Sequence, residues 1–316
     1  MKDLERFLRV KLAALPTPIQ KLENLSRMLG IELFVKRDDM TGAATGGNKV
    51  RKLEFLLAEA QAQGAEVIFT TGGAQSNHAM LTAACSVKLG MTPILILKQR
   101  GVTACRGNLL LEKLMGTEVR FMDTDSYDDI YREMDRLGTQ MGKPYYKIPC
   151  GGSTGLGALG YVDCVREIAA QGLRPDVLVV AEGSGGTHAG TALGTALYLP
   201  DTAVYGVSVD TDPFPEITPA ILREAAAMLE AEDVGAKVRT RHLDMTGPGY
   251  AVPSEEGNAA IRLMAAREGI FLDPVYTGKA FAGLLKMVRS GEIRPGAQVL
   301  FLHTGGIGGL FARDDL

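Results

Sequence analysis

Apolar residues recur along this chain with two alternating periods, which predict a succession of strands and helices. Short runs rich in Val, Ile and Leu, such as residues 67–71 and 177–181, are typical of buried strands. Between such runs, apolar residues recur every three to four positions, as in 50–63, where Leu53 and Leu57 share one helical face. Because strands that alternate with helices form βαβ units, the pattern predicts mostly parallel sheets with helices on both faces.

The same pattern divides the chain into two sets of units. In the first half we expect strands at residues 31–36, 67–71, 93–98, 118–122 and 145–148, and helices at 50–63, 78–89, 108–115 and 127–141. In the second half we expect strands at 176–181, 203–209 and 298–302, and helices at 160–171, 187–197, 218–232, 255–268 and 279–290. A glycine-rich loop at 151–160 separates the two sets. The sequence therefore predicts an α/β fold of two doubly wound lobes, with a ligand site between them.

Composition and charge restrict the class of protein. The 316 residues suffice for two lobes, and 46% apolar with 22% charged residues is typical of a soluble globular chain. With 34 basic and 37 acidic residues, the chain lacks the basic excess of nucleic-acid-binding proteins, so we expect no nucleic-acid partner. The first residues form no apolar leader, and no apolar run approaches a length of about 18 residues. We therefore expect no membrane partner and a cytoplasmic location.

Cysteine and histidine spacing gives no sign of a metal or a disulfide framework. The four cysteines are Cys85, Cys105, Cys150 and Cys164. No two of them form a C-x-x-C pair, so reduced thiols are expected. His78, His188 and His303 fall at glycine-rich loops, but no H-x-x-x-H pair occurs, and we expect no metal.

Glycine is in clear excess, with 38 of 316 residues against a usual frequency of about 7%. Eighteen of these glycines fall in five windows, at residues 41–48, 71–78, 151–160, 183–190 and 304–309. Three windows follow predicted strands directly. Because ligands bind beyond the carboxyl ends of strands in open α/β sheets, we expect these three loops to share one crevice.

The loop at 183–187, G-S-G-G-T, precedes a predicted helix. Its free backbone N–H groups and the positive end of the helix dipole suit a phosphate. A tight turn is the simpler interpretation. A dinucleotide fingerprint is another, with Asp210 at the end of the next strand as the ribose-binding acid, but it requires glycine where this chain has His188.

Residues 45–55, T-G-G-N-K-V-R-K-L-E-F, place cations at the start of a predicted helix. Lys49 and Lys52 share one helical face, and Asn48 is the expected N-cap. Positive charge at a helix N-terminus opposes the helix dipole, so a bound anion would relieve an unfavourable arrangement. A solvated basic face is the alternative, and the preceding glycines favour the anion site.

Two other segments are candidates for binding. Ser76 and Asn77 lie at the start of the helix at 78–89, where they would cap the helix or bind a substrate carboxylate. Residues 273–279, D-P-V-Y-T-G-K, are typical of a turn that leads into a helix. The G-x-S-x-G nucleophile motif of serine hydrolases is absent.

Five segments together resemble a known family. They are G-G-N-K-V-R-K-L-E-F at 46–55, Q-S-N-H at 75–78, G-S-G-G-T-H-A-G at 183–190, D-P-V-Y-T-G-K at 273–279 and H-T-G-G at 303–306. The chain resembles the D-cysteine desulfhydrase and 1-aminocyclopropane-1-carboxylate (ACC) deaminase family. Its members are pyridoxal 5′-phosphate (PLP) enzymes of the tryptophan-synthase-β fold, fold type II. The likeness runs in order from residues 15–18 to 310–312.

The resemblance implies a cofactor, an assembly and a division into domains. The cofactor would be PLP, the substrate a small amino acid and the assembly a homodimer. Residues 1–48 and 159–316 would form a larger PLP-binding domain, and 49–158 a smaller α/β domain.

The resemblance also implies roles for residues already singled out. Lys49 would bind PLP covalently and, once released by substrate, move the Cα proton. The catalytic residues would be Lys49, Ser76 and Tyr276. Cofactor contacts would come from Lys49, Lys52, Asn77, Gly183, Ser184, Gly185, Thr187, Thr277 and Thr304. Substrate contacts would come from Ser76, Asn77, His78, Tyr250 and Tyr276.

Two threonines bear on which family member this chain resembles. ACC deaminases carry Glu and Leu at the positions of Thr277 and Thr304, whereas D-cysteine desulfhydrases carry Thr at both. A hydroxyl near the pyridine nitrogen makes a weaker electron sink than a carboxylate, which suits β-elimination better than opening a cyclopropane ring. We therefore expect a carbon–sulfur lyase acting on D-cysteine. L-Cysteate sulfo-lyase, which releases sulfite, and ACC deaminase are the alternatives within the family.

Two alternative functions lie outside this family. A nucleotide-dependent oxidoreductase would use the loop at 183–190 and Asp210, but it leaves Lys49 and Lys52 without a role. A scaffold that binds an amino acid or PLP without turnover is the non-enzymatic alternative.

Overall fold

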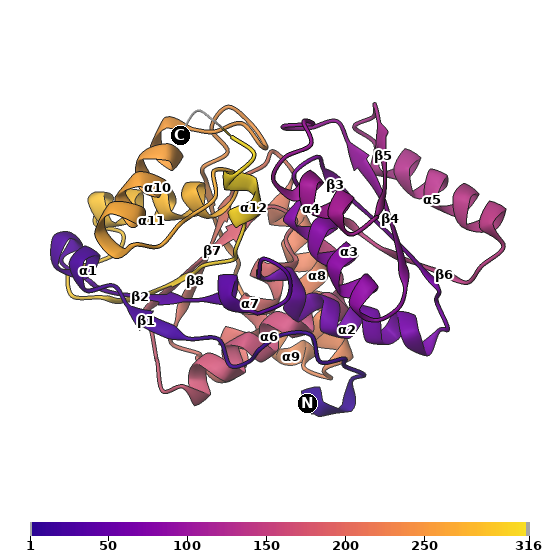
Figure 1. Cartoon of the computed structure of the whole chain (residues 1–316). Helices are drawn as coiled ribbons and strands as arrows, with labels where there is room; N and C mark the ends of the chain where they lie inside the picture. The colour runs from indigo at the N-terminus through magenta and orange to yellow at the C-terminus, as the bar shows by residue number, and fades with distance from the viewer. Residues whose placement is uncertain (1, 314–316) are drawn as a thin grey trace.

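The computed structural model describes residues 2–313 and places the strands in two sheets, as Figure 1 shows. The larger sheet has the strand order β1-β2-β10-β7-β8-β9, and the smaller one has the order β5-β4-β3-β6. Strand β1 runs antiparallel to β2, and the other neighbouring pairs are parallel. The predicted α/β class with mostly parallel sheets is confirmed.

The smaller sheet lies at the right of Figure 1 with α3, α4 and α5. Its strands are β3 (Val67–Gly73), β4 (Thr92–Lys98), β5 (Glu118–Met122) and β6 (Tyr145–Ile148). The accompanying helices are α2 (Lys49–Ala62), α3 (Asn77–Lys88), α4 (Asn108–Leu114) and α5 (Tyr127–Met141). Every one of these elements was predicted to within two residues at each end.

The larger sheet is formed by segments from both ends of the chain. Its strands are β1 (Ile19–Lys21), β2 (Glu32–Lys36), β7 (Val177–Glu182), β8 (Ala203–Ser208), β9 (Arg241–Asp244) and β10 (Gln298–Leu302). The helices are α1 (Glu23–Leu29), α6 (Gly155–Ala170), α7 (Gly186–Tyr198), α8 (Phe214–Met228), α9 (Glu232–Gly235), α10 (Glu255–Glu268), α11 (Thr277–Ser290) and α12 (Ile307–Leu310). Short 3-10 helices cover Leu4–Arg6, Asp38–Met40 and Cys150–Gly152.

Both faces of the larger sheet are covered by helices, and successive residues of β10 illustrate how. Val299 and Phe301 pack in a cluster with residues of α1, α10 and α11, whereas Leu300 and Leu302 pack on the opposite face with residues of α6. Because successive strand residues point to opposite faces, a strand buried on both sides reads as a continuous apolar run.

Two of the predicted helices are displaced by more than two residues. Helix α6 begins at Gly155 rather than at 160, so half of the expected 151–160 loop is helical. Thr154 caps it by accepting a hydrogen bond from the N–H of Gly157 at 3.1 Å. Gly160 is required for close packing, because a Cβ there would lie 2.4 Å from the carbonyl oxygen of Arg51. Helix α8 begins at Phe214 rather than at 218, with Pro215 in the first turn, where the missing N–H costs no helical bond.

Helix α2 joins the two halves of the molecule through a buried ionic cluster. The Arg51 guanidinium donates to Asp38 at 2.8 and 2.9 Å and to Glu167 of α6 at 2.9 Å. Tyr161 donates to Asp38 at 2.6 Å. Burial raises the pKa of Asp38, but the charge of Arg51 outweighs it and leaves that pKa below its ordinary value.

We propose the division into a smaller domain at 49–158 and a larger domain at 1–48 and 159–316. It is supported by the strands, since β3 to β6 fall inside 49–158 and the strands of the larger sheet fall outside it.

Candidate active site

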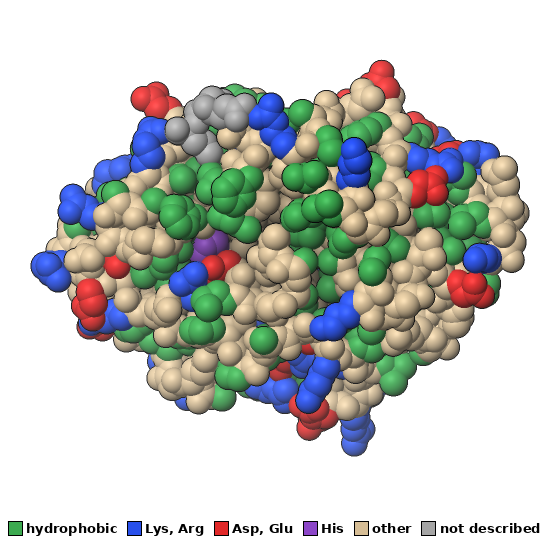
Figure 2. Space-filling model, in the orientation of Figure 1, with side chains coloured by type: hydrophobic (Ala, Val, Ile, Leu, Met, Phe, Trp, Pro, Cys, Tyr) green, Lys and Arg blue, Asp and Glu red, His purple; other side chains and the backbone are tan. Residues whose placement is uncertain are grey.

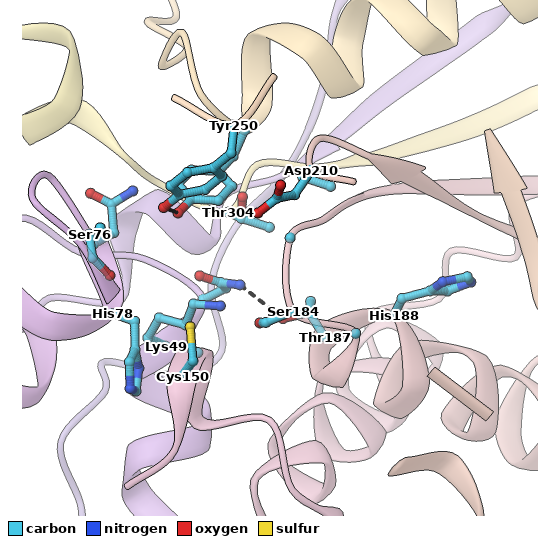
Figure 3. Close-up of a pocket in the computed structure, with 18 of the residues that line it drawn as sticks. Lys49, Ser76, His78, Cys150, Ser184, Thr187, His188, Asp210, Tyr250 and Thr304 are labelled. Atoms are coloured by element: carbon cyan, nitrogen blue, oxygen red, sulfur yellow. Dashed lines mark hydrogen bonds between the residues drawn. The ribbon is translucent and has the colours of Figure 1, made fainter. Parts of the chain in front are cut away.

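A cavity between the two sheets is lined by the loops that follow β3, β7 and β10 (Figure 3). Its lining includes Asn48, Lys49, Gly73, Ser76, Asn77, His78, Lys98, Arg100, Tyr127, Cys150, Gly151, Ala181, Gly183, Ser184, Gly185, Thr187, His188, Asp210, Tyr250, Tyr276 and Thr304. The prediction that the three glycine-rich loops share one crevice is confirmed. Within residues 2–313, most of the residues implied by the family resemblance meet here.

Lys49 is the first residue of α2, and its side chain reaches the cavity floor near Cys150 in Figure 3. Its neighbour Asn48 donates from Nδ2 to the hydroxyl of Thr187 at 2.9 Å, which joins this helix start to the start of α7. Burial lowers the pKa of Lys49 to about 8. About a tenth of its amine is therefore unprotonated at pH 7, far more than for an ordinary lysine, and this form is able to act as a nucleophile.

Lys52 lies one turn further along α2, behind the cavity wall. Its Nζ donates to the carbonyl of Gly151 at 3.1 Å and to the Ser153 hydroxyl at 3.3 Å. Burial and the charge of Lys49 hold the pKa of Lys52 well below its ordinary value. Two buried amines at one helix N-terminus, with no acidic residue in its first turn, form the unfavourable arrangement predicted from the sequence.

The loop after β7 faces Lys52. A Cβ on Gly186 would lie 2.8 Å from Lys52 Nζ and 2.7 Å from the Ser153 hydroxyl, so only glycine allows this approach. Ser153 also donates to the Ser184 hydroxyl at 2.8 Å. The backbone N–H groups of residues 183–187 and the N-terminus of α7 therefore form an anion site with an adjacent amine.

The start of α3 forms a second site of this kind. Ser76 is the N-cap residue, and its hydroxyl accepts from the N–H of Ala79 at 3.2 Å. Asn77 accepts from Nδ2 of Asn108 at 2.8 Å, which fixes its amide. His78 contacts the Thr70 hydroxyl through Nε2 at 2.8 Å, and burial and the nearby lysines hold its pKa well below its ordinary value. Ser76 is thus both a cap and a cavity residue.

Two tyrosines close the cavity on the side of the larger sheet. The hydroxyls of Tyr250 and Tyr276 lie 2.5 Å apart. Burial raises the pKa of both phenols, so both stay protonated at neutral pH. Asp273 holds this turn by accepting from the N–H groups of Tyr276 at 2.9 Å and Thr277 at 2.8 Å.

The two threonines of the family comparison lie in different surroundings. Thr304 lines the cavity, and its carbonyl accepts from the N–H of Asn48 at 3.0 Å. Thr277 is fully buried behind Tyr276, and its hydroxyl donates to Asp273 at 2.7 Å. Thr277 and Lys52 are the two residues of the implied site that do not line the cavity.

Several cavity residues were missed by sequence reasoning. Lys98 ends β4 and Arg100 follows it, so the rule that ligands bind beyond strand ends applies to them as it does to β3. Tyr127 and Cys150 lie together, with the Tyr127 hydroxyl 3.2 Å from Cys150 Sγ, and no sequence signal relates them.

His188 belongs to a side-chain cluster behind the loop at 183–187, which we call the phosphate-type loop. Figure 3 shows its ring directed away from the cavity. Nδ1 of His188 and Nδ1 of His242 each lie 2.7 Å from a carboxylate oxygen of Glu182. These three side chains are close enough to hold a metal ion. Thr218 and Ser208 also donate to Glu182, at 2.6 and 3.2 Å, so its carboxylate is fully hydrogen-bonded without one.

These features fit PLP as a set. The start of α7 with Lys52 suits its phosphate, the amine of Lys49 suits its aldehyde, and the glycine at 186 leaves the space that a Cβ would fill. The start of α3 remains for a substrate carboxylate. The geometry thus defines a PLP-dependent enzyme of the α/β type.

Comparison with known proteins identifies the family. Residues 10–305 match the family described as "Pyridoxal-phosphate dependent enzyme". The chain is 43% identical to a D-cysteine desulfhydrase of Serratia proteamaculans, over 98% of this chain and 97% of that protein. It is 42% identical to a Pyrococcus horikoshii protein named provisionally as an ACC deaminase, over 99% and 96% of the two chains. The chain belongs to the D-cysteine desulfhydrase and ACC deaminase family of PLP-dependent enzymes.

Solved structures agree on the fold. A crystal structure of an ACC deaminase homologue matches with a TM-score of 0.91 and 41% identity, over 98% of this chain and 94% of that one. Tomato threonine deaminase and maize serine racemase match with TM-scores of 0.66 and 0.67 at 18% and 16% identity, which shows the shared type II fold alone. Within residues 2–313, every helix is too short or too polar to cross a lipid bilayer.

Proposed function

We propose that this PLP-dependent enzyme catalyses β-elimination from an amino acid that carries sulfur on Cβ, with D-cysteine as its substrate. D-Cysteine and water would give pyruvate, hydrogen sulfide and ammonia. The observation that carries the proposal is the meeting of the Lys49 amine with two helix N-termini in one cavity, one suited to a phosphate and one to a carboxylate.

The residues of the chain have separate tasks in this proposal. The start of α7 and Lys52 would hold the cofactor phosphate, and Asn77 and Thr304 would contact the ring. Ser76 and the N–H groups that follow it would hold the substrate carboxylate. Lys49 would hold the cofactor covalently and, once displaced by the substrate amine, take the proton from Cα. When bound, PLP supplies the sink for the electron pair that the Cα–H bond leaves behind.

The hydroxyls of Tyr250 and Tyr276 would lie beside the substrate. Because the pKa of Tyr276 is raised, its hydroxyl is protonated and able to hydrogen-bond the sulfur as the Cβ–S bond breaks. The three-carbon enamine that leaves the enzyme then hydrolyses in water to pyruvate and ammonia. A hydroxyl at Thr304 supports elimination over ring opening, because elimination needs the weaker electron sink.

Product analysis tests the proposal. Purified protein should be yellow, and D-cysteine should give pyruvate and sulfide in equal amounts. Lys49→Ala should abolish the colour and the turnover. Lys143→Ala, at an exposed site just before β6, should keep both. Ammonia and 2-oxobutyrate from ACC, with no pyruvate from cysteine, would refute elimination and favour the ACC deaminase alternative.

We also propose a cytoplasmic homodimer. The four free cysteines support a reducing compartment.

Exposed apolar side chains support self-association: Leu114 of α4 is 74% exposed and Phe311 beside α12 is 72% exposed. The two helices are neighbours, since a Cβ on Gly107 would lie 2.5 Å from the carbonyl of Gly308, and Figure 2 shows hydrophobic surface in this region. Light scattering should give the mass of a dimer, and Leu114→Asp with Phe311→Asp should give a monomer.

A further inference from the structure

The side chains that surround Glu182 have no part in the function proposed so far. Glu182 is the last residue of β7, and its side chain is buried behind the phosphate-type loop. Its carboxylate accepts hydrogen bonds from His188 of α7, Thr218 of α8, Ser208 of β8 and His242 of β9. We call these five residues the Glu182 cluster. Because its donors come from four different elements, one carboxylate joins the end of β7 to the elements packed around it.

The hydrogen bond between Glu182 and His188 spans the phosphate-type loop. Glu182 directly precedes residues 183–187, and His188 directly follows them in the first turn of α7. Nδ1 of His188 lies 2.7 Å from the Glu182 carboxylate, which fixes the two ends of the loop relative to each other. A Cβ on Gly206 would lie 2.2 Å from the same nitrogen, so the His188 ring packs directly against β8.

The hydroxyl of Thr218 contacts the loop as well as the carboxylate. It donates to Glu182 at 2.6 Å, and a Cβ on Gly185 would lie 2.9 Å from it. Gly185 has a φ of +79°, which glycine adopts readily. On the other side of the loop, a Cβ on Gly183 would lie 2.9 Å from the Tyr276 ring. The loop is therefore held between the Glu182 cluster and a wall of the cavity.

The backbone of the loop is left free to bind an anion. In the part of the chain that the structure describes, the N–H groups of Gly183, Ser184 and Gly185 donate to no backbone or side-chain acceptor. The loop is therefore fixed mainly by contacts with the side chains behind it. Donors that are held in place before the ligand arrives bind it without the entropic cost of ordering the loop.

We propose that Glu182, His188, Thr218 and His242 are positioning residues that hold the phosphate-type loop in the shape that binds the cofactor phosphate. The proposal rests on the placement of the PLP phosphate at the start of α7, and it is independent of which amino acid is the substrate. Loss of a donor in the Glu182 cluster should weaken the binding of the phosphate and leave the other contacts of the cofactor unchanged.

A purely stabilising role for the Glu182 cluster makes a different prediction. Pyridoxal has the ring and the aldehyde of PLP but lacks the phosphate, so the ratio of the two dissociation constants isolates the contribution of the phosphate. If the cluster only contributes to the free energy of unfolding, its loss would change the binding of PLP and pyridoxal by the same factor. If it positions the loop, the affinity for PLP alone should fall.

Absorbance titration of the PLP-free protein with PLP and with pyridoxal measures both constants. We expect Thr218→Val and His242→Leu to weaken PLP binding about tenfold and pyridoxal binding by less than about twofold. His242→Asn, which keeps an N–H donor, should restore most of the affinity for PLP. Thr202→Val is the matched control, because its hydroxyl donates to the carbonyl of Pro175 at 2.6 Å, at the opposite end of β8 from the loop. It should leave both constants unchanged.

Gly186→Ala separates the positioning role from the phosphate site on which it rests. If this variant weakens PLP binding alone while Thr218→Val and His242→Leu leave the ratio of the two constants unchanged, the positioning role is refuted and the phosphate site stands. If Gly186→Ala also leaves the ratio unchanged, the placement of the phosphate is wrong. Dialysis against a chelator should not alter the ratio, and a loss of PLP affinity that Zn²⁺ restores would overturn the proposal in favour of a metal site.

Discussion

Replacement of Lys49, the lysine proposed to bind PLP, should stabilise the PLP-free protein. Lys49 lies among buried groups with a pKa near 8 instead of 10.5, so folding withdraws its ammonium from water without supplying a partner anion. The difference corresponds to roughly 3 kcal/mol at about 1.4 kcal/mol per pKa unit. Lys49→Met keeps the chain length of the side chain and removes the charge.

The sign of the pH dependence follows from the lowered pKa. Below pH 8 Lys49 is protonated in both the folded and the unfolded protein, so the folded state bears the whole penalty. Between pH 8 and 10.5 the unfolded chain holds a proton that the folded one has lost, and wild-type stability rises with pH. The advantage of Lys49→Met should therefore be largest at pH 7 and shrink towards pH 10.5.

Urea denaturation of PLP-free wild type and Lys49→Met at pH 7 and pH 10 measures this effect. Lys143→Met is the matched control, because its exposed pair with Glu66 should contribute less than about 1 kcal/mol at either pH. A variant that is less stable than wild type at pH 7, or a gain that stays constant up to pH 10, would refute the argument that the Lys49 amine is buried at the expense of stability.

Two further predictions concern the phosphate-type loop. Burial raises the pKa of Glu182, but hydrogen bonds from His188 and His242 outweigh this effect and bring the pKa to about 2. The stabilising contribution of the Glu182 carboxylate is therefore complete above its ordinary pKa near 4.5 and is lost as the pH falls towards 2. Glu182→Gln should therefore lower the free energy of unfolding by about 1–3 kcal/mol at pH 7, and thermal denaturation at falling pH should show the gap to wild type narrowing. Gly186→Ala should weaken PLP binding about tenfold, a change of about 1.4 kcal/mol, because its Cβ would crowd Lys52 and Ser153. Absorbance titration with PLP checks this, and Gly309→Ala, where a Cβ meets open space, should bind PLP like wild type.

The fold was readable from the sequence because its strands are buried on both faces. Strand β10 is apolar at every position from Val299 to Leu302, and it was placed without error. Strand β9, Arg241–Asp244, was missed because it lies at the edge of the sheet and its short polar run has neither the apolar continuity nor the alternation that identifies a strand. The start of α6 was predicted five residues too late, because glycines that allow close helix packing were interpreted as loop residues.

The sequence predicted the candidate site where a single motif contains both glycines and the polar or charged residues that bind a ligand. The glycines around Lys49 and in the 183–187 loop indicated anion sites before any relative was considered. Lys98 and Tyr127 meet only because β4 and the start of α5 converge in three dimensions, and no local pattern relates them. Thr277 lies within a recognised motif, yet its hydroxyl is taken by Asp273, which only the tertiary contacts reveal.

The buried cluster around Arg51 decides which parts of the active site belong to one rigid body. Arg51 lies two residues after Lys49 on α2, and its pairs with Asp38 and Glu167 tie the start of that helix to the larger lobe. A rotation of the smaller sheet relative to α2 would carry the start of α3 towards or away from the Lys49 amine, while the amine kept its distance from the start of α7. A substrate whose carboxylate binds at α3 would then draw its own Cα up to Lys49, so the group that distinguishes amino acids from other amines would also set the alignment for proton transfer.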